Sequence, residues 1–387
     1  MSRMRLAIVT PGTFPVPSGR SSSVEQVAMQ VGEKLKRQAE VTVFGKKTRS
    51  LPARELLDGI RHIRPPVKPY IRQVARVLKR EVPDIVQCEN RPRHARLLKR
   101  LFPEKPVVLS LHSTTFLSRP HISAPELRGC LQAADAIVVN SQFLKERVAA
   151  SDASVAAKIV VNHLGVDTER FVSRWTEEEE RKRQAQLNAL GLAGKKIILY
   201  VGRFIPIKGV HQLLAVLPTI TAFEPEAVLL LVGGAYYGSN RMTPYVRRLR
   251  RMARDAKPHV RFIPFIPHEQ MPSWFRLADT VVVPSTGEEA FGLVNVEAMA
   301  CGVPVVASAS GGMKEIIQHG STGLLAEPGA LAEQLVRHVC ALLGDRDYAR
   351  SLGENGMQRV HDHFTWQHTA DRLYALYDRL RANGGMP

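Results

Sequence analysis

The chain has 387 residues, of which 44% are hydrophobic and 23% charged, the composition of an ordinary soluble globular protein and not of a mainly disordered one. Its length suits two α/β domains of roughly 150–200 residues each, and no apolar run approaches the roughly 18–20 residues of a membrane-spanning helix. The formal charge of +18 is uneven, because residues 1–174 carry 30 basic and 15 acidic side chains whereas residues 175–387 carry 24 and 21. Such a charge distribution favours anionic partners.

The first apolar segment, residues 4–9, is shorter than the apolar core of a signal peptide, so we expect a cytoplasmic protein. The four cysteines lie far apart and form no CxxC pair. Zinc ligation and a disulfide framework are therefore disfavoured, and we expect buried free thiols at Cys88, Cys130, Cys301 and Cys340.

Short apolar runs alternate with amphipathic stretches of helical length along the chain. The predicted strands form two series, the first at residues 6–9, 41–44, 84–88, 107–111, 136–139 and 159–161, and the second at 196–201, 228–232, 260–263, 280–283 and 303–307. Predicted helices between them include residues 24–36, 70–80, 209–220 and 330–343. Continuous apolar strands that alternate with helices predict an α/β fold with two doubly wound parallel-sheet domains.

A charged segment near residues 172–194 separates the two series. Thr176 is followed by four glutamates and then by basic residues, the order that the dipole of a capped helix favours. We therefore expect domains at residues 1–174 and 175–365, with a final helix in 366–387 that packs back on the first domain.

The loop after the predicted strand 196–201 carries Arg203 and Lys208, and a helix follows Gly209. Ligands of open α/β sheets bind beyond the carboxyl ends of the strands, and two cations beside a helix N-terminus suit a diphosphate. Most such pairs are solvated loop residues when they are taken alone, so this interpretation depends on further motifs.

A second segment places Glu289 at a loop-to-helix junction and Glu297 inside the helix, which we expect from about Phe291 to Cys301. Two carboxylates accept hydrogen bonds from hydroxyls, so sugar and ribose are natural partners. The alternative is that Glu297 is a solvated helix residue and Glu289 only complements the helix dipole. The glycines that flank the segment, such as Gly292, make that alternative less attractive.

The Glu-x7-Glu segment, with Phe-Gly-Leu-Val and Glu-Ala-Met-Ala-Cys-Gly-Val-Pro in residues 289–304, resembles the signature of family 4 glycosyltransferases. Residues 201–209 resemble their phosphate loop, and further motifs follow in the order typical of the family. Within that family the segments Phe14-Pro15-Val16-Pro17-Ser18 and Cys88-Glu89-Asn90-Arg91-Pro92 are most similar to spore-coat-associated members of bacilli.

The resemblance implies a GT-B fold, in which two Rossmann-like domains face a cleft, with the acceptor mainly on the first domain and the nucleotide sugar on the second. It implies retaining, hexosyl-type transfer from a nucleotide-diphosphate sugar, with a UDP-sugar expected, to a glycan, lipid or envelope acceptor. No metal and no cofactor other than this co-substrate is expected. The expected cytoplasmic location would then combine with association with the spore coat, as the narrower resemblance implies, or with peripheral membrane contact through the basic N-terminal domain.

The resemblance also implies roles for individual residues. Arg203 and Lys208 would neutralise the diphosphate as the glycosidic bond breaks, and His112 would lie near the reacting sugar. The implied catalytic residues are His112, Glu289, Arg203 and Lys208. The implied nucleotide-sugar site, with Glu289 on sugar hydroxyls, Glu297 on the ribose and Phe265 and Ile266 beside the base, comprises Gly19, Arg203, Lys208, Phe265, Ile266, Glu289, Phe291, Gly292, Leu293, Val294 and Glu297.

Two positions depart from the family pattern. Ser21 and Ser22 stand where members usually have a Gly-Gly pair after the first strand, and Ala290 replaces a usual proline. Because only glycine adopts positive φ freely, the serine loop motivates an alternative, a catalytically weak or inactive GT-B protein with a structural role in the envelope. A nicotinamide dehydrogenase is disfavoured, because no glycine-rich segment has the GxGxxG spacing.

Asp345-Arg346-Asp347 has the spacing of a metal-binding Asp-x-Asp but follows a predicted helix, so we interpret it as a helix cap. Basic residues cluster in residues 61–105, with thirteen Lys/Arg against four acids, and in residues 241–261, with eight against one. About half of them should merely solvate helix faces, and the rest could attract an anionic acceptor or a membrane surface. Nucleic acid is not expected, because interleaved aromatic residues and known binding motifs are absent.

Overall fold

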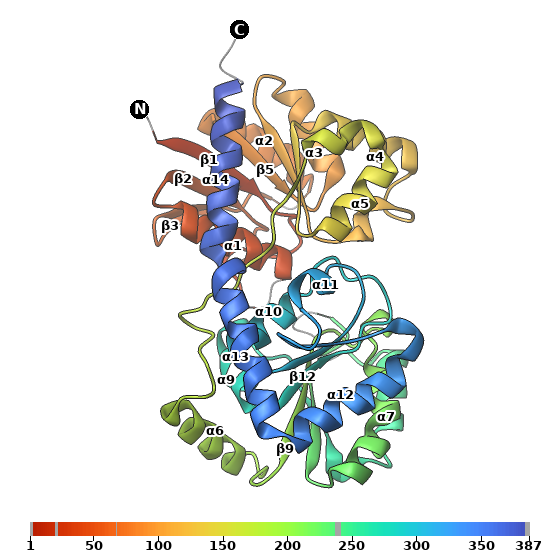
Figure 1. The fold of residues 1–387 in the computed structure, drawn as a ribbon. Coiled ribbons are helices and arrows are strands. Elements are labelled where there is room, and N and C mark those ends of the chain that lie inside the picture. Colours follow the sequence, from red (N-terminus) through yellow and green to blue (C-terminus); the bar gives the residue numbers. More distant parts are fainter. Residues whose placement is uncertain (1–2, 20–21, 67, 237–240, 384–387) are drawn as a thin grey trace. The chain divides into compact units, whose positions relative to one another are not determined.

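The computed structural model describes residues 3–19, 22–66, 68–236 and 241–383, which form two compact units (Figure 1). Unit 1 comprises Met1–Leu164 and Trp366–Pro387, and unit 2 comprises Gly165–Thr365. The division therefore falls earlier than the boundary expected after residue 174. Arg174 shows why, since its backbone N–H donates to the carbonyl of Cys301 at 3.0 Å and its guanidinium lies 3.2 Å from Asp279, both in unit 2.

Unit 1 is built on an eight-stranded sheet in the order β3-β4-β2-β1-β5-β6-β7-β8. Neighbouring strands pair in parallel except for β3 and β4. The strands are β1 (Met4–Val9), β2 (Ala39–Phe44), β3 (Arg54–Leu57), β4 (Ile60–Ile63), β5 (Ile85–Glu89), β6 (Val107–Leu111), β7 (Ala136–Val139) and β8 (Ile159–Val161). The carboxyl ends of β1 and β5 lie at the point where the strand order reverses, the usual ligand position in such sheets.

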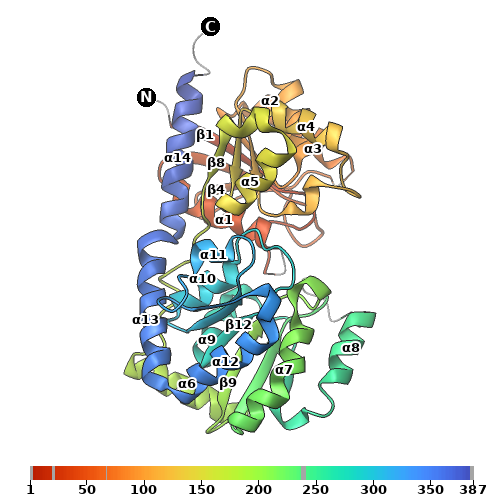
Figure 2. The same cartoon turned by 45° about the vertical axis from the view of Figure 1, so that its right-hand side comes forward.

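Helices cover both faces of the unit 1 sheet. They are α1 (Ser23–Leu35), α2 (Tyr70–Glu81), α3 (Pro92–Leu101), α4 (Ala124–Ala133), α5 (Gln142–Ser151) and α14 (Trp366–Asn383). Helices α1 and α14 lie side by side, whereas α3, α4 and α5 form a separate group (Figures 1 and 2). The last helix thus belongs to the first unit although it is the final element of the chain.

Unit 2 has a six-stranded, wholly parallel sheet in the order β11-β10-β9-β12-β13-β14. Its strands are β9 (Lys196–Val201), β10 (Ala227–Val232), β11 (Val260–Ile263), β12 (Thr280–Val283), β13 (Val305–Ser308) and β14 (Leu324–Ala326). Numbered within the unit, this order is 3-2-1-4-5-6, the order of dinucleotide-binding Rossmann domains. The order reverses between β9 and β12.

The helices of unit 2 are α6 (Glu177–Ala189), α7 (Val210–Phe223), α8 (Pro244–Met252), α9 (Met271–Leu277), α10 (Leu293–Ala300), α11 (Met313–Ile316), α12 (Leu331–Gly344) and α13 (Arg346–His363). Helix α12 packs beside α7, and α13 packs beside α10 (Figure 2). Thr176 caps α6 as the sequence predicts, because its hydroxyl accepts a hydrogen bond from the N–H of Glu179 at 3.3 Å.

The predicted α/β class with two doubly wound parallel-sheet domains is confirmed. All four cysteines are buried free thiols, as expected. Within the described residues, no helix combines the length and the apolar character that crossing a membrane would require.

Candidate functional site

The loops after β9 and β12 are joined at the point where the strand order of unit 2 reverses. The backbone N–H of Thr286 donates to the carbonyl of Ile207 at 2.9 Å. Gly209, at φ +70°, brings the start of α7 so near the other loop that an added Cβ would lie 1.7 Å from the carbonyl oxygen of Pro284. Only glycine fits there, so the two loops pack directly against each other at the carboxyl edge of the sheet.

Lys208 and Glu289 meet in this assembly. The Nζ of Lys208 lies 2.5 Å from Oε1 of Glu289, and the hydroxyl of Ser285 donates to the same oxygen at 2.8 Å. The carbonyl of Glu289 accepts from the N–H of Gly312 at 2.8 Å, which ties the residue to the loop after β13. Three strand-end loops therefore fix one carboxylate and one ammonium group side by side.

Arg203 lies in the same loop as Lys208, directly after β9. The buried hydroxyl of Tyr200 donates to the carbonyl of Arg203 at 2.9 Å, and this contact fixes the backbone that carries the guanidinium. Burial, and then the charge of Glu289, raise the pKa of Tyr200 well above its ordinary value, so its hydroxyl remains a donor at neutral pH.

Helix α10 begins at Leu293 and not near Phe291, which corrects the expected start. Gly292, at φ +100°, is the residue before the helix and turns the chain into it. Phe291 is instead a buried side chain whose ring packs at 6.1 Å from that of Phe364. The backbone N–H groups of Leu293 and Val294 consequently lie in the first turn, where helical N–H groups lack intrahelical partners.

Glu297 is buried, so the alternative of a solvated helix residue is wrong. Its Oε1 lies 2.8 Å from Nε2 of His268, a residue that the sequence analysis did not single out. Burial alone would lower the pKa of His268, but the hydrogen bond and the charge of Glu297 outweigh it and raise this pKa above its ordinary value. Its position in the sequence could have identified it, because His268 follows Phe265 and Ile266 in the loop after β11.

Phe265 and Ile266 are half-buried residues of that same loop. The contact between His268 and Glu297 therefore links the loop after β11 to helix α10. The ring of Phe171 packs against His268 at a centroid distance of 5.5 Å and closes one side of the imidazole. The residues expected beside the base and the residue expected on the ribose are thus connected through one histidine.

His112 belongs to unit 1, where it directly follows β6. Its Nε2 lies 2.6 Å from Oε2 of Glu89, the last residue of the neighbouring strand β5. The side-chain amide oxygen of Asn90 accepts from the backbone N–H of His112 at 3.2 Å, and Asn140 donates to its carbonyl at 3.3 Å. The imidazole and its backbone are therefore held from both neighbouring strand ends.

The loop after β1 is only partly described. Ser21 lies outside the described residues, and no described atom beyond its chain neighbours approaches the Cβ position of Gly19 within 4 Å. Ser22 occupies the N-cap position of α1, but its hydroxyl bonds the carboxylate of Glu25 and makes no hydrogen bond to the helix backbone.

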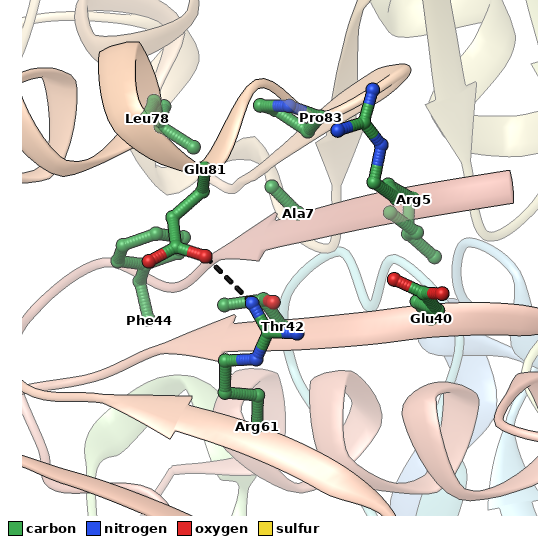
Figure 3. Close-up of a pocket in the computed structure, with 10 residues that line it drawn as sticks. Arg5, Ala7, Glu40, Thr42, Phe44, Arg61, Leu78, Glu81 and Pro83 are labelled. Carbon is green, nitrogen blue, oxygen red and sulfur yellow. Dashed lines mark hydrogen bonds and ion pairs between the residues drawn. The ribbon is translucent and has the colours of Figure 1, made fainter.

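Other recesses lie away from these residues. In unit 1, one is lined by residues of β1, β2 and α2, and the ion pair between Arg61 and Glu81 spans it at 2.6 Å (Figure 3). Asp345 caps α13 as predicted, since its carboxylate accepts from the N–H of Tyr348 at 2.9 Å. Among the described residues, no group of three or more His, Cys, Asp or Glu side chains could hold a metal ion.

Two family regions match most of the chain. Residues 24–170 match the region described as Glycosyltransferase Family 4, and residues 182–359 match Glycosyl transferases group 1. Spore coat protein SA of Bacillus subtilis is 31% identical over 378 residues, which cover 98% of this chain and 100% of that protein.

Solved structures share the fold. Sucrose-phosphate synthase from Thermosynechococcus elongatus has a TM-score of 0.83 at 26% identity, covering 98% of this chain and 100% of that one. Anabaena HepE, solved in complex with UDP, has a TM-score of 0.80 at 22% identity, covering 97% and 100%. The expected GT-B class of two Rossmann-like units is thereby confirmed.

Proposed function

We propose, from the premise that the chain belongs to glycosyltransferase family 4, that it transfers a hexosyl group from a UDP-sugar with retention of the anomeric configuration. Glycosyl transfer from a nucleotide-sugar donor follows from the family itself. The observation that supports the finer proposal is the contact between Lys208 and Glu289 at the carboxyl edge of the unit 2 sheet.

The donor would lie along this edge with its diphosphate on Arg203 and Lys208. During transfer the bond from the anomeric carbon to the diphosphate oxygen breaks, a bond to the acceptor oxygen forms, and the proton of the acceptor hydroxyl passes to the departing diphosphate. Negative charge then develops on the diphosphate, and two fixed cations stabilise it more than they stabilise the bound donor. Because Lys208 already contacts Glu289, its ammonium group is oriented before the donor arrives.

Glu289 and Glu297 would hold the two hydroxyl-bearing ends of the donor. Glu289 sits beside the expected diphosphate position and would accept from sugar hydroxyls. In Glu297, Oε1 is engaged by His268, which leaves Oε2 to accept from a ribose hydroxyl. Phe265 and Ile266 would cover the base. Uracil is our choice because a fold neighbour, HepE, was solved with UDP.

Unit 1 would receive the acceptor. Arg91 follows β5, its guanidinium lies 3.8 Å from the ring centre of Phe116, and its Nη1 donates to the carbonyl of Asn90 at 2.9 Å. Burial lowers the pKa of Arg91, and the charge of Glu25 acts in the opposite direction. A guanidinium held in this way would bind the anionic group of an acceptor.

The test is donor hydrolysis with a panel of UDP-, GDP- and ADP-sugars. We expect nucleotide release with a UDP-sugar, and Lys208→Met should reduce kcat/KM by about 10²-fold or more because one leaving-group cation is lost. Lys195→Met is the matched control, since Lys195 pairs with Glu226 on the surface of the same unit. Tight UDP binding without release from any donor or acceptor would instead support the structural envelope protein.

A further inference from the structure

A buried chain of hydrogen bonds in unit 1 runs from α14 through β5 to His112. The hydroxyl of Tyr377 contacts Oε1 of Gln87, and Nε2 of Gln87 donates to Oε1 of Glu89 at 2.5 Å. Oε2 of Glu89 then lies 2.6 Å from Nε2 of His112. Tyr377, Gln87 and Glu89 are each at most 1% exposed, and the His112 side chain is 8% exposed.

This contact decides which ring nitrogen of His112 carries a proton. A carboxylate only accepts hydrogen bonds, so Nε2 must be protonated to contact Glu89. The hydroxyl of Ser110, 3.3 Å from Nε2, is a weaker second neighbour. In the neutral ring, Nδ1 then carries a lone pair, and this atom is buried with no hydrogen-bond partner among the described residues.

A buried acceptor without a hydrogen bond costs free energy unless a donor from a ligand or a water molecule supplies one. His62 is a useful contrast, because it is also buried but neither of its nitrogens has a partner, and burial lowers its pKa. No carboxylate contact among the described residues therefore fixes which nitrogen of His62 carries the proton. His112 differs in having one nitrogen fixed by a carboxylate and the other left without a partner in the described structure.

We infer that Glu89 is a positioning residue that holds His112 in the Nε2–H form, so that Nδ1 accepts a hydrogen bond from a substrate hydroxyl. The inference rests on the proposed function for the identity of that hydroxyl, which belongs to the acceptor that unit 1 would receive. The logic is that of a nucleophile or base whose orientation is set by a third group. Gln87 and Tyr377 in turn fix the carboxylate.

The first test determines the tautomer of the His112 imidazole directly by NMR. In ¹H–¹⁵N long-range spectra at a pH where the imidazole is neutral, His112, assigned with His112→Gln, should show the Nε2–H form. Glu89→Gln offers an amide that can turn its NH₂ toward Nε2, so the spectrum should lose that preference or change to Nδ1–H. An unchanged Nε2–H spectrum in a folded Glu89→Gln protein would overturn the inference.

The second test separates positioning from general loss of structure. Glu89→Gln should lower kcat by about 10-fold or more with little change in the donor KM, and it should add little further loss in a His112→Gln background. Leu131→Ala, which truncates a buried side chain of α4 in the same unit, should lower Tm while the His112 spectrum and kcat/KM remain. Additive losses from Glu89→Gln and His112→Gln would contradict the inference.

The two tests also separate this inference from the proposed function. If the wild-type spectrum shows the Nε2–H form and depends on Glu89, the positioning role stands at the level of structure. Absence of transfer with every donor would then contradict the proposed function alone. Transfer activity with an His112 ring that is indifferent to Glu89 would contradict only the inference.

Discussion

The two carboxylates of the candidate donor site are held by different kinds of partner. Glu289 contacts the ammonium group of Lys208, whereas Glu297 contacts the imidazole of His268, whose pKa is raised in the folded protein. The contact between His268 and Glu297 is therefore expected to change with pH near neutrality. This dependence gives the site a measurable pH signature.

We expect His268 to stabilise unit 2 at mildly acidic pH. Because its pKa is raised in the folded protein, the stabilisation is fully present below its ordinary pKa of about 6.5 and is lost as pH rises through the folded value. His268→Gln should therefore lower the free energy of unfolding by about 1–3 kcal/mol at pH 6 and by less at pH 9. Thermal denaturation across this range measures the difference.

His62→Gln is the control with the opposite sign. Burial lowers the pKa of His62, so charging this ring destabilises the fold as pH falls through about 6.5. The His62→Gln substitution should therefore increase the free energy of unfolding most at low pH. If the loss of unfolding free energy in His268→Gln grew toward pH 9, this result would contradict a raised pKa for His268.

At the residue scale the sequence supplied the charged positions but not their partners. Lys208 and Glu289 each follow a predicted strand, but that these two strands, β9 and β12, are neighbours is seen only in the structure. His268 could not be paired with Glu297, because nothing local shows that the loop after β11 reaches helix α10. The contact between Glu89 and His112 was missed for the same reason, since it joins two separate strand ends.

At the scale of elements, a single glycine fixes how the two site loops pack. Gly209→Ala would place a Cβ 1.7 Å from a backbone oxygen of Pro284, and a backbone atom cannot rotate away as a side chain does. We expect this variant to destabilise unit 2 by several times the cost of about 1 kcal/mol for alanine at positive φ, and to abolish donor hydrolysis.

Gly194→Ala isolates the conformational part of that cost. Gly194 has almost the same φ, +71° against +70°, but no atom of the described residues, its chain neighbours aside, lies within 4 Å of its Cβ position. The Gly194→Ala variant should lose only about 1 kcal/mol of the free energy of unfolding, measured by urea denaturation, and should retain its activity, measured by nucleotide release. Equal losses in the two variants would show that the close approach of the loops is unimportant.

Elements were predicted best where burial imposes a simple pattern. The predicted strands at residues 107–111, 196–201 and 280–283 agree with the structure to the residue, because continuous apolar runs mark strands buried on both faces. The hairpin of β3 and β4 was missed, since β3 is largely exposed and carries no apolar run. Its signal was the Asp58-Gly59 turn, where both residues have positive φ.

For the whole molecule, charge is the property that the site does not explain. Arg72, Arg76, Lys79 and Arg80 recur on the exposed face of α2, and none of them pairs with a carboxylate among the described residues. Solubility alone does not require four exposed basic residues on one face of a helix. We therefore expect it to take part in attraction to an anionic surface.

The prediction is salt-sensitive binding to anionic vesicles. Each basic residue near such a surface contributes about 1 kcal/mol, so changing these four residues of α2 to glutamine should weaken binding to phosphatidylserine vesicles by 10²-fold or more. Raising the ionic strength should likewise weaken the binding of the wild-type protein to these vesicles, because salt screens the interaction. The matched control changes four exposed basic residues of α8 in unit 2, Arg247, Arg248, Arg250 and Arg251, and should bind nearly as the wild type does. Equal losses in the two variants would mean that net charge, and not the face of α2, directs the attraction.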